Sequence, residues 1–477
     1  MVCKQCCGLG VRHVQLLLMT FCFAIVQIFH EGPLLAIMLA KTEEHDSSSH
    51  HEDQFKNTVV MWGRREIDLL DAGWHYVYPF ACFAGGILCN KLNNKHSLLG
   101  IVFFLSILCY TLPTIVKRKS ESIGFIAMFS VRVIIGIFQG ISEPILYQVM
   151  GRWVTINDLS FASILCEVGC VTGRVIIHGS MYFIGKNVHG WTSVFYTSGN
   201  LGLLWCVAWF TFGAGDFRSC FYVSSDEKNY MINNTYDLDS YGLISEIGKR
   251  PFRWKTIFTT MDLYVLLLTN GLTHWSRTHL LVPPFMLEYF NSFHSETPEQ
   301  FDINKFIGVN IAIILVTVVI GAVADRIVSR GKVRASHVRK TCNSIGFWGK
   351  AISMVLTGHA STSVYRRVMS FFLVFFSVFA CVGVDVAFLE MAPNYSGFIY
   401  AIVTSLTSLP RSALVLANTL THLTMTPAVF KALLYISALL HFFANFIYVT
   451  CFSSRIADFN RSELMIQTKS LSINFSS

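Results

Sequence analysis

Twelve long apolar runs constrain what this sequence of 477 residues can fold into more than any other feature. A helix needs about 20 mostly apolar residues to cross the hydrocarbon core of a bilayer. Runs of about that length lie at 12–40, 69–90, 97–116, 124–147, 160–184, 190–213, 257–283, 304–324, 341–358, 368–391, 396–418 and 429–452. The sequence therefore predicts an all-α membrane protein with twelve transmembrane helices.

The low charge content supports this prediction. Only 14% of the residues are charged and 53% are hydrophobic, whereas a soluble domain is about a quarter charged. This composition excludes ordinary soluble folds, disordered chains and small disulfide scaffolds. The net charge of +8 is explained by basic cytoplasmic loops, so we expect a lipid bilayer and no nucleic acid among the partners.

The distribution of Lys and Arg predicts the orientation. The two tails and the loops after even-numbered spans hold more of these residues than the opposite loops, which predicts that both termini are cytoplasmic. No sorting signal separates a lysosomal or vesicular membrane from the plasma membrane. The exterior loop 41–68 combines acidic residues with His. We interpret it as a solvated loop, and we predict neither a metal site nor a cofactor.

A loop motif occurs twice, half a chain apart. The second and eighth predicted spans each end on a glycine that is followed, four and five residues later, by a polar and a basic residue. These residues are Gly86, Asn90 and Lys91, and then Gly321, Asp325 and Arg326. The repeat indicates two six-helix halves, and we expect these loop residues to take part in gating.

The repeat also predicts the domain boundaries. We place the N-terminal half at 1–213 and the C-terminal half at 257–453. A polar linker at 214–256 joins the two halves, and a cytoplasmic tail follows at 454–477.

Charged residues inside the spans are the candidate functional residues, because a charge within the bilayer is costly. Arg132, Gln139 and Glu143 share one face of the fourth span. Asp71 and His75 lie four residues apart on the second span, a spacing that suits a proton relay. The alternative for each is a structural pair with a neighbouring helix.

Four further residues, on three spans, complete the candidate set. His30 and Glu31 bring adjacent titratable groups to the first span, where they should face a cavity. Arg277 and Arg411 lie in the seventh and eleventh spans and could bind an anion or neutralise a carboxylate. The candidates for ion or proton coupling are thus His30, Glu31, Asp71, His75 and Glu143, and those for substrate binding are Arg132, Gln139, Arg277 and Arg411.

Several stretches resemble a known family. The Gly-x-x-x-Asp-Arg segment that ends at Arg326 is similar to the loop signature of the major facilitator superfamily. Segments 132–144, 190–205, 225–230, 338–340, 390–397 and 409–410 resemble one branch of it, the anion:cation symporter family. This branch contains sialin, the vesicular glutamate and nucleotide transporters, and the sodium/phosphate co-transporters.

The resemblance implies twelve helices around a central cavity and alternating access for organic anions or phosphate. It also implies a role for Arg132, which matches the family arginine of the fourth helix. Gln139 stands where vesicular glutamate transporters carry glutamate, and Asp71 stands where they carry histidine. The chain departs from the family on the first helix, where the usual arginine is missing, and at Asn90, which replaces the usual aspartate.

We therefore predict a divergent, monomeric secondary transporter of small organic anions that is coupled to protons. A sodium-coupled phosphate or anion co-transporter is the alternative within the same class. Two alternatives from other classes are a transport-dead sensor, suggested by the altered first helix, and a membrane-embedded acyltransferase-like enzyme that would use His30-Glu31 or Asp71 with His75.

Overall fold

The computed structural model describes residues 10–47, 62, 64–118, 121–183, 190–234, 254–276, 303–359, 363–421, 427–453, 455 and 457. Every regular element in these ranges is a helix. The first six long helices are α1 (Val11–Ser47), α2 (Arg64–Leu88), α3 (Asn94–Arg118), α4 (Glu121–Trp153), α5 (Leu159–Ser180) and α6 (Thr192–Phe212).

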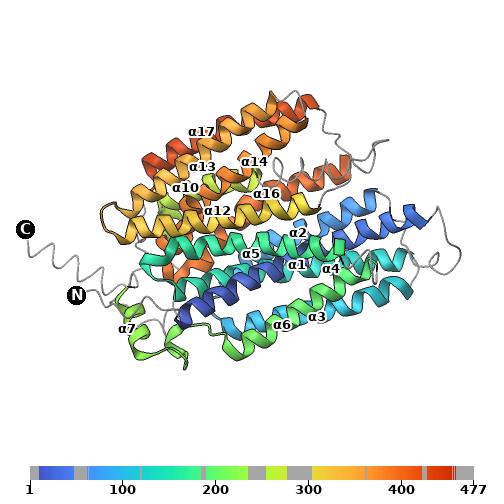
Figure 1. Cartoon of the computed structure of the whole chain (residues 1–477), viewed down its shortest axis with the longest axis horizontal. Coiled ribbons are helices and arrows are strands. Elements are labelled where there is room, and N and C mark those ends of the chain that lie inside the picture. Colours follow the sequence, from blue (N-terminus) through green and yellow to red (C-terminus); the bar gives the residue numbers. More distant parts are fainter. Residues whose placement is uncertain are drawn as a thin grey trace, which may run out of the picture.

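The second set of helices lies alongside the first (Figure 1). It consists of α10 (Met261–Ser276), α12 (Ile303–Ser329), α13 (Ala335–Gly358), α14 (Ser363–Ala380), the π-helical turn η5 (Cys381–Asp385), α15 (Val386–Met391), α16 (Ser396–Thr421) and α17 (Pro427–Cys451). Each of the twelve predicted spans coincides with a helix here, if α14, η5 and α15 are taken as one broken span. Short helices connect them: η1 (Ile156–Asp158), η3 (Phe217–Ser219), α7 (Ser225–Asn233), α9 (Trp254–Thr259) and η6 (Pro393–Tyr395).

Seven helical segments of the described chain are long and apolar enough by themselves to cross a membrane. They are Val11–Ile37, Asn94–Thr114, Ile123–Trp153, Ile156–Phe183, Ile307–Ser329, Phe371–Met391 and Lys431–Cys451. Among the other helices, α2 carries charged residues, and α10 is described only as far as Ser276. The site described below uses both kinds of helix, because α1 and α4 are among the seven segments whereas α2 and α16 are not.

Several helices extend beyond the predicted apolar spans. Helix α1 continues to Ser47 and α2 starts at Arg64, so both reach into the segment 41–68 that was expected to be a loop. The expected linker 214–256 contains α7 and the start of α9. A hydropathy pattern finds only the part of a helix that lies in the bilayer, so polar helical turns beyond it are missed.

The connecting helix α7 is attached to the N-terminal half. The Glu227 carboxylate accepts hydrogen bonds from the backbone N–H groups of Val11 at 3.2 Å and Arg12 at 3.0 Å. Arg12 in turn forms a 2.9 Å ion pair with Asp158, and its guanidinium lies 4.8 Å from the Tyr230 ring centroid. A carboxylate at the first turn of α1 satisfies free amides and complements the helix dipole.

Candidate functional site

Arg132 is the centre of a buried polar cluster in the N-terminal half. Its side chain on α4 is fully buried. Nε donates to the carbonyl of Leu70 at 3.1 Å, and one terminal nitrogen donates to the carbonyl of His30. The other terminal nitrogen lies 3.1 Å from Asp71 Oδ1. The guanidinium therefore ties α1 and α2 to α4 and leaves few donors for another ligand.

Asp71 connects this arginine to a histidine. His75 Nε2 lies 3.7 Å from Asp71 Oδ2, one helical turn further along α2. The Asp71 side chain is 42% exposed, whereas those of Arg132 and His75 are 0% and 3% exposed. Asp71 is thus the most exposed of these three side chains.

Glu143 joins the two halves. Its carboxylate accepts hydrogen bonds from the hydroxyl of Tyr78 on α2 and, at 2.8 Å, from that of Tyr400 on α16. Gln139 donates to the other carboxylate oxygen at 3.0 Å and accepts from Trp74 Nε1 at 2.9 Å. A change in the charge of the Glu143 carboxylate would therefore alter contacts on both sides of the interface between the halves.

Arg411 approaches the same cluster from the C-terminal half. Its guanidinium carbon lies 6.0 Å from the centroid of the Trp74 ring, and its buried Nε has no hydrogen-bond partner. The Nε2 atom of His30 is also buried without a partner, and the imidazole lies 4.4 Å from the same indole. Two unsatisfied nitrogens therefore flank Trp74. A carboxylate or phosphate oxygen is the natural acceptor for such a guanidinium.

The structure brings together most of the predicted residues. Asp71, His75, His30, Arg132, Gln139, Glu143 and Arg411 all belong to this connected region. Their roles in binding and coupling stay predictions. Arg277 lies outside the described residues.

Glu31 does not share a site with His30, although the two are adjacent. It accepts a 2.6 Å hydrogen bond from Gln27 and lies 3.7 Å from His178 Nδ1 on α5. Successive residues on a helix point about 100° apart. His30 therefore faces Trp74 on α2, while Glu31 faces α5.

Three aromatic residues of the site were not predicted. Trp74 donates a hydrogen bond to Gln139 and stacks on Tyr78 with the ring centroids 4.4 Å apart. Tyr78 follows Asp71 and His75 at helical spacing, so that spacing could have revealed it. Tyr400 reaches Glu143 from 257 residues away, and no local pattern predicts this contact.

The second loop motif, which lies in the last turns of α12, bridges the two halves at one end of the bundle. Asp325 accepts hydrogen bonds from the backbone N–H groups of Ser160 at 2.9 Å and Phe161 at 2.7 Å, at the start of α5. Arg339 donates to the Ser160 hydroxyl and lies 3.5 Å from Glu390. The acidic residue thus caps a helix of the other half. Arg326, next to it, is exposed.

At the matching motif around the end of α2, the two halves contact each other through close packing and a neutral side chain. A Cβ atom on Gly86 would lie 2.3 Å from Cβ of Ala401, so only glycine allows this approach of α2 to α16. The first amides of α16 are met by the neutral Gln148, whose Oε1 accepts from Gly397 N at 3.2 Å. Asn90 Nδ2 is buried without a partner, and Lys91 is exposed. The halves therefore meet closely at the end that carries both loop motifs, and the gating role of these residues stays a prediction.

Solved structures share this fold. The proton:xylose symporter XylE superposes with a TM-score of 0.64 over 94% of this chain and 98% of its own, at 12% identity. A bacterial homologue of the iron transporter ferroportin, in its outward-facing state, gives a TM-score of 0.60 over 94% of this chain and all of its own, at 15% identity. Likenesses at such identities show the fold alone.

Curated relatives are more similar in sequence. Vesicular glutamate transporter 1 of Xenopus tropicalis is 24% identical over 72% of this chain and 57% of its own length. Vesicular glutamate transporter 2 of Homo sapiens is 23% identical over 83% and 66%, and the chloroplastic ascorbate transporter of Arabidopsis thaliana is 24% identical over 63% and 52%. The chain thus spans little more than half the length of the first of these relatives.

The family comparison covers most of the chain. The profile described as Major Facilitator Superfamily matches residues 16–415. The predicted resemblance to the anion:cation symporter branch is confirmed by the vesicular glutamate transporters among its relatives, and the low identity indicates a divergent member. The chain is an integral, multi-pass membrane protein that belongs to the Major Facilitator Superfamily.

Proposed function

We propose that this chain is a secondary active transporter that moves a small organic anion across a membrane by alternating access, coupled to protons. The observation that carries the proposal is the buried cluster in which Glu143 of α4 is bonded to Tyr400 of α16. A site shared by both halves can be remodelled when the halves move relative to each other. The relatives named as glutamate and ascorbate transporters agree with an anionic substrate.

Arg411 is the anion-binding residue in this proposal. Its buried Nε has no hydrogen-bond partner and it lies beside the Trp74 ring, so it can bind a carboxylate without first breaking an existing ion pair. It takes the place of the arginine that the family carries on the first helix. Arg132 is a positioning residue, because Asp71 and two carbonyls already bind its guanidinium.

Asp71 and Glu143 are the proton carriers in this proposal. Protonation of Asp71 would remove the charge that holds Arg132, and protonation of Glu143 would change its bonds to Tyr78 and Tyr400. Either event alters a contact between helices, which is what coupling requires. His75 lies within reach of Asp71 as a relay.

Uptake into proteoliposomes tests the proposal. Labelled glutamate, sialic acid, urate, nucleotides and phosphate would be offered in turn under an imposed proton gradient or an imposed sodium gradient. We expect the proton gradient to drive accumulation of a carboxylate and the sodium gradient to have no effect. The Lys332→Gln variant, in an exposed turn away from the site, is the matched control and should transport normally.

Three other outcomes contradict the proposal. Accumulation driven only by sodium favours the sodium-coupled alternative. Anion binding in a thermal-shift assay without accumulation under either gradient favours a transport-dead sensor. Covalent turnover of a lipid or acyl donor would favour the membrane-embedded enzyme.

A further inference from the structure

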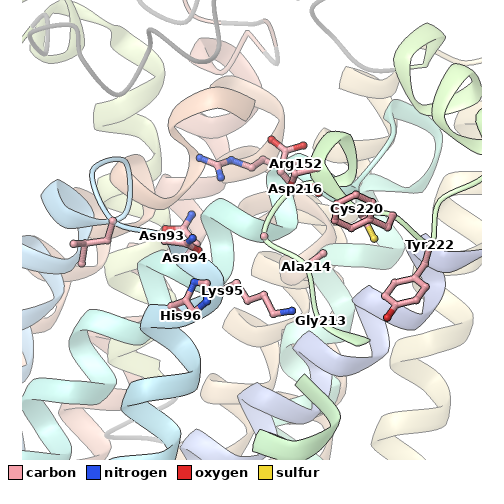
Figure 2. Close-up of a pocket in the computed structure, with 14 residues that line it drawn as sticks. Asn93, Asn94, Lys95, His96, Arg152, Gly213, Ala214, Asp216, Cys220 and Tyr222 are labelled. Atoms are coloured by element: carbon pink, nitrogen blue, oxygen red, sulfur yellow. Dashed lines mark hydrogen bonds between the residues drawn. The ribbon is translucent and has the colours of Figure 1, made fainter. Parts of the chain in front are cut away.

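A pocket of about 400 Å³ lies away from the cluster around Glu143, where α3 begins and α4 and α6 end. Figure 2 shows that its lining residues come from three parts of the chain: the turn into α3, the last turn of α4 and the segment after α6. The polar side chains of the lining include Asn94, Lys95, His96, Arg152 and Asp216. None of them has a part in the proposed transport site.

The pocket is built on a fixed frame. Trp209 Nε1 donates to the carbonyl of Lys95 at 3.1 Å, and Trp153 Nε1 donates to the carbonyl of Ala214 at 3.0 Å. Gln15 on α1 accepts from the amide of Ala214 at 3.0 Å. Two tryptophans and a glutamine thus hold the two backbone segments that form the walls.

The polar lining fits a phosphate group. Lys95 and Arg152 bring two positive charges, and Asp216 lies beside Arg152 and balances one of them (Figure 2). The first amides of α3 add donors at the positive end of a long helix. Lys95 uses one N–H on the carbonyl of Phe210 at 3.0 Å, and its other two can bind a ligand.

Asn94 shows that this lining has unmet hydrogen-bonding capacity. Its side chain is only 3% exposed, and neither Nδ2 nor Oδ1 has a hydrogen-bond partner. Leaving a buried amide unsatisfied costs about 1–3 kcal/mol. A phosphate ester with a neighbouring hydroxyl would satisfy both atoms, because the amide could donate to the phosphate and accept from the hydroxyl.

The surroundings of the pocket favour a lipid over a soluble phosphate. Below it, α3 and α6 expose apolar side chains such as Phe103 (52%) and Val207 (64%), as helices do where they face lipid. At its rim, Phe221 is fully exposed and Tyr222 is 66% exposed. Exposed aromatic side chains are typical of the depth at which lipid headgroups lie.

We propose that this pocket binds the phosphate headgroup of an anionic phospholipid whose acyl chains lie along the exposed face of α3 and α6. The headgroup binds Lys95, Arg152, the Asn94 amide and the first turn of α3. On the side predicted to be cytoplasmic, the membrane leaflet is the one rich in anionic lipid.

Native mass spectrometry of the purified full-length protein tests this proposal without depending on transport. Protein stripped of lipid would be offered phosphatidylglycerol, whose headgroup carries hydroxyls beside the phosphate, in competition with phosphatidylcholine. We expect Asn94→Asp to weaken retention of phosphatidylglycerol about tenfold, as loss of a charge-assisted hydrogen bond does. Thermal unfolding of the lipid-free variant checks that the fold survives the introduced carboxylate, which the dipole of α3 favours. Lys95→Gln should weaken retention as well.

Lys332→Gln is the matched control, because it removes one exposed charge from the basic turn after α12, at the same end of the other half. It should leave retention unchanged. Equal losses in Lys332→Gln and Asn94→Asp would show that only general surface charge attracts the lipid and would overturn the proposal. Displacement of the lipid by an equal concentration of inorganic phosphate would also overturn it, since the site would then be one for soluble phosphate.

Discussion

At the scale of single residues, Arg132 and Arg411 show two different uses of a costly charge. Both reach the same aromatic and acidic cluster, but Arg132 is bonded on three sides whereas the Nε of Arg411 has no hydrogen-bond partner. A buried ion pair is strongly destabilised when one partner is removed. A buried donor that lacks a partner destabilises the fold by about 1–3 kcal/mol and is available to a ligand.

We predict opposite effects of removing these two arginines. Arg132→Gln should destabilise the protein by about 3 kcal/mol, because Asp71 and two backbone carbonyls lose their donor. Arg411→Gln removes a buried donor that has no partner, so it should not destabilise the protein but should weaken anion binding at least about tenfold. Thermal unfolding with and without the transported anion measures both effects. Equal destabilisation by the two variants would contradict the assignment of Arg411.

The sequence revealed the charged residues of this cluster but not its aromatic residue Tyr400. Charges within apolar helices are rare and costly, so Arg132, Asp71 and Glu143 stand out against their surroundings. Aromatic residues are abundant in this chain, with 40 Phe and 17 Tyr, so Tyr400 does not stand out. Its contact with Glu143 depends on how the halves pack, which helical spacing within one element cannot predict.

At the scale of elements, the two loop motifs hold helices of the opposite half by different means. Asp325 caps α5 with a charge, whereas α16 is capped by the neutral Gln148 and by close packing at Gly86. A carboxylate at a helix N-terminus contributes about 0.3–2 kcal/mol. The sequence predicted the motifs from their repeat. It missed Gln148, which lies outside them on α4, and the polar turns that extend α1 and α2 beyond the bilayer.

We predict that Asp325→Asn weakens the contact between α12 and α5. The amides of Ser160 and Phe161 should exchange hydrogen about fivefold faster, because loss of the charged cap lowers the cost of local opening. Hydrogen–deuterium exchange with mass spectrometry measures this directly. Arg326→Gln, at the exposed neighbouring position, should leave the exchange unchanged. If both variants behave alike, the cap does not hold the helix.

At the scale of the whole molecule, close approaches at glycine residues limit how tightly the two halves can close at the loop-motif end, and Gly86 is one of them. A Cβ atom on Gly86 would lie 2.3 Å from Cβ of Ala401, so α2 and α16 could not keep their present separation. Overpacking of this kind costs about 1–3 kcal/mol. That is enough to shift a balance between two arrangements of the halves about tenfold.

We predict that Gly86→Ala opens this end of the molecule and slows uptake about tenfold. The amides of 396–403 at the start of α16 should become less protected from exchange. Gly100→Ala on α3 is the matched control, because a Cβ atom there meets nothing within 4 Å, and it should leave uptake unchanged. Normal uptake by Gly86→Ala would show that this approach is not needed for closure.

The hydrogen bonds between Glu227 and the beginning of α1 make α7 part of the N-terminal half of the structure. Because α7 holds the first turn of α1, a polypeptide that is cut before Ser225 loses a stabilising partner of its own first helix. Two fragments expressed separately should therefore reassemble best when the first fragment retains everything up to Asn234. We therefore expect the chain to tolerate being split after α7 better than being split at the end of the sixth span.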